Sequence, residues 1–114
     1  MNIVSLKATN MDMTDAIREY VVEKTGALDK FVEGFEPAAE MSVEVGKSSN
    51  HHNKGPHMRC ELNLTLPGTM LRSEEEREDL YEAIDVACDD LKRQLKDHKE
   101  RLIDQRHAPR PGKE

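Results

Sequence analysis

The sequence of 114 residues contains two cysteines, no tryptophan and no hydrophobic run that approaches the length of a membrane-spanning helix. Such a helix needs about 20 consecutive apolar residues, so we expect no membrane partner. The first residues do not show a basic stretch followed by a long apolar one, and we therefore expect no secretory signal. Few cysteines and no export signal together predict a reduced, cytoplasmic protein.

Motifs that would indicate enzymatic chemistry are missing as well. The sequence has no HExxH, no CxxC, no phosphate-binding glycine loop and no serine–histidine–aspartate phrase. Aromatic residues make up 4% of the chain, which argues against recognition of single strands by base stacking. Cys60 and Cys88 occupy apolar positions and are expected to be small buried residues. We therefore predict that the protein is not an enzyme and has no cofactor and no small-molecule substrate.

Charge is distributed unevenly along a chain whose net charge is −6. Residues 74–90 contain one arginine against nine acidic residues, whereas residues 91–114 contain eight basic and four acidic residues. Residues 47–59 contain three basic residues and no acidic one. Local basic zones can bind a polyanion even when the whole molecule is acidic. The distribution therefore leaves a nucleic-acid partner open.

The first third of the chain predicts a strand and then a helix. Residues 2–8 are rich in apolar and β-branched side chains, which favours a strand. Asp12 or Thr14 is a candidate N-cap for a helix that runs to about residue 32, and Gly26 weakens that helix so that it frays or bends there. Its apolar stripe follows three- and four-residue steps and consists of Met13, Ile17, Tyr20, Val21, Leu28 and Phe31.

The rest of the chain predicts three strands and a long helix. Apolar and polar residues alternate from residue 39 and again over residues 58–66, which indicates two half-buried strands. Pro67-Gly68 predicts a turn into a fourth strand at about 69–74. An apolar stripe then predicts a helix over about 76–106. The acidic cluster before and at its start is interpreted as electrostatic stabilisation of that helix and consists of Glu74, Glu75, Glu76, Glu78 and Asp79. Residues 107–114 are expected to form a disordered tail.

Together these elements predict one α+β domain over residues 1–106. The order is β-α-β-β-β-α, with two helices packed on one face of a four-stranded mixed sheet. A right-handed crossover makes the first two strands parallel if they are neighbours, and the remaining pairs are antiparallel hairpins.

Several phrases of the sequence resemble the ribosome hibernation promoting factor family, also called the ribosome-associated inhibitor, protein Y or sigma-54 modulation protein family. The resemblance covers roughly residues 2–106. It rests on DLYEAID at 79–85, LKRQL at 91–95 with His98-Lys99, and TDAIREYV at 14–21 with Glu23-Lys24. The segment 43–45 and the Pro67-Gly68 turn also fall where the family places them.

The resemblance implies a domain that binds the small ribosomal subunit in the channel for messenger and transfer RNA. Such a protein blocks translation in stationary or starved cells without chemistry of its own, and the present length resembles that of the short members. Whether it promotes ribosome dimers, and whether it self-associates, stays open. A protein–protein adaptor that uses the acidic helix start or the wet sheet face is the alternative function.

Candidate RNA-binding residues lie first of all on the second helix. At 100° per residue, Lys92, Arg93, Lys96 and Lys99 fall on one flank beside the apolar stripe, and Arg101 extends the basic segment. The alternative is a solvated helix whose charges pair at four-residue spacing, Asp89 with Arg93 and Asp97 with Arg101. Spacing alone favours the solvated helix, whereas the family resemblance favours RNA contacts.

Other candidates lie on a loop and on the first helix. His51, His52 and Lys54 form an acid-free stretch between two strands that suits RNA phosphates or base edges, or is simply a polar hairpin. A metal site of His51, His52 and His57, with or without Cys60, is a weaker alternative, because the spacing matches no standard zinc pattern. Arg18 is expected to be exposed and Lys24 to extend over the apolar stripe, and both, with Lys7, are further RNA-contact candidates.

Overall fold

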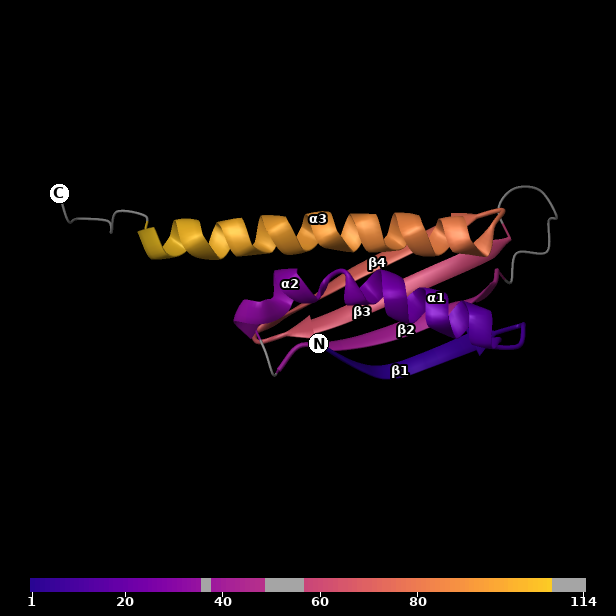
Figure 1. The fold of residues 1–114 in the computed structure, drawn as a ribbon. Coiled ribbons are helices and arrows are strands. Elements are labelled where there is room, and N and C mark those ends of the chain that lie inside the picture. The colour runs from indigo at the N-terminus through magenta and orange to yellow at the C-terminus, as the bar shows by residue number, and fades with distance from the viewer. Residues whose placement is uncertain (36–37, 49–56, 108–114) are drawn as a thin grey trace.

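A computed structural model describes residues 1–35, 38–48 and 57–107 as one sheet covered by helices (Figure 1). The order of elements confirms the predicted succession of strands and helices, although the first helical segment is divided. The elements are β1 (Asn2–Thr9), α1 (Asp15–Gly26), α2 (Asp29–Val32), the 3-10 helix η1 (Glu33–Phe35), β2 (Glu40–Lys47), β3 (Met58–Leu66), β4 (Thr69–Arg77) and α3 (Leu80–His107).

The four strands form one mixed sheet in the order β1-β2-β3-β4. β1 pairs with β2 in parallel, and the pairs β2–β3 and β3–β4 are antiparallel, as predicted. The β3–β4 turn consists of Pro67 and Gly68, since Leu66 faces Thr69 across the ladder. Gly68 has a φ of 78°, which suits glycine at the third position of a turn that places proline second.

Gly46 permits a close approach of β1 to β2. A Cβ atom at this position would lie 2.0 Å from the carbonyl oxygen of Thr9 and 2.9 Å from the carbonyl carbon of the same residue. Both contacts are to backbone atoms of the neighbouring strand, which cannot move aside as a side chain can. Only glycine fits here without separating the two strands.

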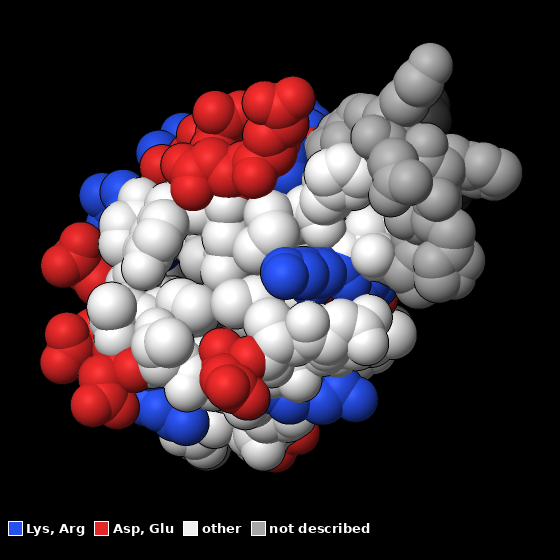
Figure 2. Space-filling view, turned by 90° about the vertical axis from the view of Figure 1, so that its right-hand side faces the viewer, with Lys and Arg blue, Asp and Glu red and all other residues white. Residues whose placement is uncertain are grey.

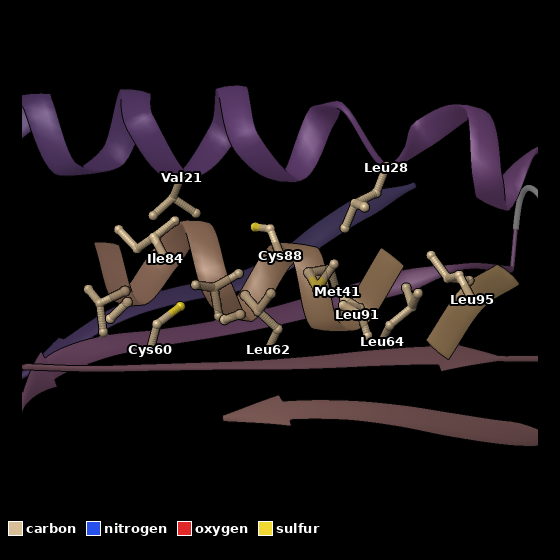
Figure 3. Packing of buried hydrophobic residues seen from close by; sticks show 14 of the residues in the cluster. Val21, Leu28, Met41, Cys60, Leu62, Leu64, Ile84, Cys88, Leu91 and Leu95 are labelled. Carbon is tan, nitrogen blue, oxygen red and sulfur yellow. The ribbon is translucent and has the colours of Figure 1, made fainter. Parts of the chain in front are cut away.

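The helices pack on one face of this sheet and enclose the hydrophobic core (Figures 1 and 3). Figure 3 shows Val21 and Leu28 from the first helical segment facing Ile84 and Cys88 of α3. The inward residues of the strands complete the core, which also contains Met41, Val43, Val45, Cys60, Leu62, Leu64, Leu91 and Leu95. Alternation in the strands and the three- and four-residue steps in α3 therefore converge on the same interior.

The prediction of one continuous helix to residue 32 is wrong. α1 ends at Gly26, and the N–H of Leu28 donates to the carbonyl of Thr25 over three residues rather than four. This tighter turn restarts the helix as α2 with Leu28 and Val32 buried. The break lies beside Gly26, where weak helix propensity predicted a bend, and the N-cap is Thr14, whose Oγ1 accepts from the N–H of Ile17 at 3.1 Å.

The predicted end of the fourth strand and the predicted start of the second helix are also wrong. β4 continues to Arg77, and α3 begins at Leu80. Glu74 and Glu76 therefore lie in a strand, opposite Glu61 and Arg59 of β3, and do not stabilise a helix start. Asp79, also a member of the predicted cluster, does stabilise the helix start, since its Oδ1 accepts from the N–H of Tyr81 at 3.3 Å.

α3 is longer than the sheet that it covers and continues past it toward the C-terminus (Figure 1). None of the helices in the described ranges is both long and apolar enough to span a membrane. Of the predicted tail, His107 is the last residue of α3, and residues 108–114 lie outside the described part of the chain.

Candidate nucleic-acid interface

Three lysines from two elements gather around one aromatic ring. The Nζ atoms of Lys30, Lys92 and Lys96 lie 5.2, 5.6 and 5.5 Å from the centroid of the Phe31 ring. Lys92 and Lys96 are four residues apart on α3, so they project from one flank of that helix. α2 buries Leu28 and Val32 and leaves Phe31 half-buried beside that flank. We call this group, Phe31 with Lys30, Lys92 and Lys96, the lysine cradle.

The lysine cradle is not neutralised by neighbouring carboxylates. Within the described ranges no acidic group lies within 4 Å of the ammonium of Lys30, Lys92 or Lys96, and all three residues are exposed. Because the lysines are exposed, each contact between an ammonium group and the Phe31 ring contributes only about 0.5–1 kcal/mol, and these side chains can leave the ring at little cost. The cradle therefore concentrates positive charge that is available to an anionic partner.

A cavity of about 320 Å³ continues from the cradle toward α1. It is lined on one side by Lys24, Lys30 and Phe31, and on the other by Asp85, Asp89 and Lys92 of α3. Its two walls thus come from helices that are far apart in the sequence.

Lys24, predicted to extend over the apolar stripe, lies over an aromatic ring at this junction. Its Nζ is 5.4 Å from the Tyr20 ring centroid and 3.6 Å from Oδ1 of Asp85. The hydroxyl of Tyr20 donates to the same Asp85 oxygen at 2.6 Å. This hydrogen bond to a carboxylate, together with partial burial, raises the pKa of Tyr20 to about 12. Lys24 is therefore partly committed to a structural contact.

The other predicted residues on α3 do not act as one group. Arg93 forms an ion pair with Asp90 rather than the predicted pair with Asp89. The Arg93 side chain is more exposed than that of Asp90. The predicted pair of Asp97 with Arg101 does not form within 4 Å. Lys99 lies further along, where it lines a mainly apolar hollow with Phe35. The flank thus contains Lys92 and Lys96 in the cradle, Lys99 beside it, and Arg93 held by a neighbour.

Lys30 was missed by the sequence analysis. Its position depends on the restart of the helix at Leu28, which rotates α2 relative to α1, so the periodicity of α1 could not place it. The one available signal was local, since Lys30 directly precedes an aromatic residue of the apolar stripe. Of the remaining candidates, Arg18 is exposed as expected, and His51, His52 and Lys54 lie outside the described residues.

The opposite face of the sheet holds its arginines in an ionic network. Arg59 pairs with Glu44 at 3.8 Å, with Glu61 at 2.5 Å and with Glu74, while Arg72 pairs with Glu61 at 2.6 Å and with Glu74 at 3.1 Å. Burial alone would raise the pKa of Glu61, but hydrogen bonds from Arg72 and Arg59 outweigh it and hold that pKa below its usual value. These arginines are therefore occupied within the fold.

Acidic side chains gather at one end of the molecule. Figure 2 looks at the end where α3 begins and shows a group of acidic side chains at the top of this view, with lysines and arginines at its edges and elsewhere on the same face. Arg77 is here engaged by Glu75 at 3.1 Å and by Glu82 at 3.6 Å. The cradle lies on the flank of α3 beyond this acidic start, so basic and acidic charge are separated along the helix.

The cysteines lie in the core, as expected. Cys60 and Cys88 are both buried free thiols, and burial raises the pKa of each to about 12. Among the described residues no group of three or more metal-binding side chains occurs. Because His51 and His52 lie outside the described ranges, the metal alternative stays a prediction that the structure does not test.

Comparison with protein families gives one match that covers most of the chain. Residues 4–103 match the family described as sigma 54 modulation protein / S30EA ribosomal protein. The matched range contains all of the buried core residues and the four residues of the cradle.

Curated relatives are longer than this chain. This chain is 37% identical over 111 residues to the ribosome hibernation promotion factor of Deinococcus radiodurans, and the aligned region covers 97% of this chain and 56% of the relative. It is 34% identical over 101 residues to the factor of the same name from Lactococcus lactis, covering 86% of this chain and 50% of the relative. The chain thus spans about half the length of these relatives.

Solved structures share the fold. The N-terminal domain of Thermus thermophilus protein Y superposes with a TM-score of 0.70 at 37% identity, covering 86% of this chain and 99% of that domain. A ribosomal subunit interface protein from Coxiella burnetii gives a TM-score of 0.67 at 21% identity, covering 88% and 99%, and supports the fold alone.

Proposed function

We propose that this chain, which belongs to the sigma 54 modulation protein / S30EA ribosomal protein family, binds the small ribosomal subunit in the channel for messenger and transfer RNA and inhibits translation under stress or in stationary phase. Ribosome hibernation promotion factors are its curated relatives, at up to 37% identity among those given above. Occupying the channel requires no bond to be made or broken. In this proposal the protein acts by exclusion, in the cytoplasm, and is not an enzyme.

The single observation that carries the proposal is the lysine cradle. It offers three ammonium groups with no carboxylate within 4 Å in the described part of the chain, although the molecule as a whole has a net charge of −6. Folded RNA is recognised mainly through its shape and its phosphates, which lysines contact as point charges. The negative charge of the molecule as a whole opposes non-specific binding, whereas the cradle attracts an anion locally.

The expected salt dependence follows from the number of cations. Each phosphate that is neutralised contributes about −0.9 to the slope of log K against log salt concentration, so three contacts give a slope near −2.7. Raising salt from 50 to 200 mM should then weaken binding about 40-fold. The assay is co-sedimentation of the purified chain with isolated small subunits at both salt concentrations. Binding that does not change with salt would contradict the proposal.

A matched pair of variants tests the surface itself. Lys92→Glu reverses one charge of the cradle, and Lys47→Glu reverses one exposed lysine at the end of β2. Both variants change the net charge by the same amount, so a general electrostatic effect would be equal in the two. We expect the cradle variant to lose subunit binding and inhibition of cell-free translation, and the control to stay within about threefold of wild type. An equal loss in both variants would refute a specific surface.

A second candidate, the protein–protein adaptor, rests on the acidic end of the molecule (Figure 2). Surface carboxylates there would suit a basic protein partner. The same co-sedimentation assay separates the two, because an adaptor of this kind would not depend on Lys92 and Lys96 for binding to purified subunits.

A further inference from the structure

The cavity beside the lysine cradle contains more than positive charge. Its lining combines an aromatic ring, Phe31, with the ammonium groups of Lys30 and Lys92 and with the carboxylate of Asp89. A site built only for phosphate would exclude the carboxylate, because it repels the ligand. The combination calls for a ligand that has a flat ring, an anion and a hydrogen-bond donor.

The two acidic residues of the cavity differ in their engagement. Asp85 accepts the hydroxyl of Tyr20 at 2.6 Å and lies 3.6 Å from Nζ of Lys24, so it already has partners. Asp89 is exposed, and it has no hydrogen bond or ion pair with another residue of the described ranges. Its carboxylate can therefore accept hydrogen bonds from a ligand.

Resting on the RNA-binding function proposed above, we propose that this cavity holds one unpaired nucleotide of the RNA. The base stacks on Phe31, the flanking phosphates contact Lys30, Lys92 and Lys96, and Asp89 accepts from the pairing edge of the base. Unpaired bases of folded RNA are commonly stacked on aromatic side chains and hydrogen-bonded on that edge. The cavity volume of about 320 Å³ lies at the small end of the range for ligand sites, as suits a single nucleotide.

The carboxylate of Asp89 determines which base is preferred. Guanine presents two adjacent N–H donors on its pairing edge, and these match the two oxygens of a carboxylate. Adenine and cytosine present one amino group, and uracil presents a carbonyl on either side of its single N–H. We therefore expect guanine to bind best and uracil worst.

The test uses the full chain and labelled oligoribonucleotides, with binding measured by fluorescence anisotropy. One oligonucleotide contains only uridine, and the other has a single central guanosine. We expect the guanosine to improve affinity about tenfold in the wild-type protein, and Asp89→Ala to remove this preference. Equal affinity for both oligonucleotides, or a preference that survives Asp89→Ala, would overturn the site.

The ring is tested by a second matched pair. Phe31→Leu keeps an apolar side chain of similar size but removes the flat surface, and Phe35→Leu makes the same change at a half-buried ring of η1. Phe31→Leu should weaken binding of the guanosine oligonucleotide about tenfold, and Phe35→Leu should change it less than twofold. Similar losses in both would show a structural effect only and overturn stacking on Phe31.

Failure of this inference differs from failure of the proposed function. If Phe31→Leu and Asp89→Ala both co-sediment with small subunits as wild type does, while the cradle variant does not, the nucleotide site is wrong and ribosome binding stands. If free guanosine monophosphate competes as well as the oligonucleotide does, the site belongs to a free nucleotide, and the assignment to RNA is overturned. If the oligonucleotide discrimination holds but wild type does not co-sediment, the site stands and the proposed function falls.

Discussion

Replacing Gly46 by alanine should destabilise the protein much more than the addition of one methyl group would suggest. The added Cβ would meet the carbonyl oxygen of Thr9 at 2.0 Å, so β1 must move away from β2 at the end of their parallel ladder. That movement also strains the hydrogen bond that Thr9 donates to Glu44. Overpacking of this kind costs about 1–3 kcal/mol, and each hydrogen bond lost adds about 1 kcal/mol. We therefore expect a loss of about 2–4 kcal/mol.

Gly26→Ala is the matched control, because it makes the same chemical change at the end of α1. A Cβ there meets nothing within 4 Å, and the backbone does not need glycine. Alanine should stabilise the helix by about 0.5–1 kcal/mol. With about 4 °C per kcal/mol for a domain of this size, the melting temperature should fall about 8–16 °C in Gly46→Ala and rise about 2–4 °C in Gly26→Ala.

Thermal unfolding followed by circular dichroism measures both variants, and urea unfolding checks the free energies. The reasoning fails if Gly46→Ala melts within 2 °C of wild type, since the backbone would then have absorbed the contact. It fails equally if Gly26→Ala loses as much stability as Gly46→Ala, because the loss is attributed to the contact of the added Cβ with Thr9, which is absent at Gly26.

Three further predictions concern ionisable groups. In wild type, ultraviolet absorbance should show a phenol that ionises near pH 12, and Tyr20→Phe should remove that transition. Because the pKa of Tyr20 is raised in the folded protein, the stabilisation by this hydroxyl is present below the ordinary pKa of tyrosine and is lost as the pH rises toward 12. Glu61 has a lowered pKa, so its stabilisation is present above the ordinary pKa and is lost as pH falls through the folded value; acid unfolding of Glu61→Gln should therefore depend less steeply on pH than that of wild type. Cys60 and Cys88, with pKa values raised to about 12, should resist a thiol reagent at pH 8 in the native protein and react at once in urea; rapid labelling of the folded protein would contradict their burial.

Alternation and helical periodicity were sufficient to predict the sheet and α3. The buried residues of β2 and β3 alternate with exposed or half-buried ones, so the face of each strand that lies against the core could be predicted. The parallel pairing of β1 with β2 followed from the handedness of the crossover. These features depend on patterns that lie within one segment of the sequence.

Features that depend on contacts between segments were not predictable in the same way. The run Glu74 to Glu76 is equally compatible with a helix start and with a strand, and its pairing with β3, where Arg59 lies, decides for the strand. Lys30 joins Lys92 and Lys96 only because α2 packs beside α3. The basic character of α3 was visible in the sequence, but the composition of the site was not.

The ionic network on the far side of the sheet gives the molecule a direction. Arg59 and Arg72 are held by three glutamates, so that side presents carboxylates, and no unoccupied guanidinium, to anything that approaches it. In the proposed binding mode, RNA would find both of these arginines already engaged and would contact the cradle on the helical side instead. The orientation of the bound protein would then be set by which cations are left unpaired, because Lys30, Lys92 and Lys96 have no carboxylate within 4 Å in the described part of the chain.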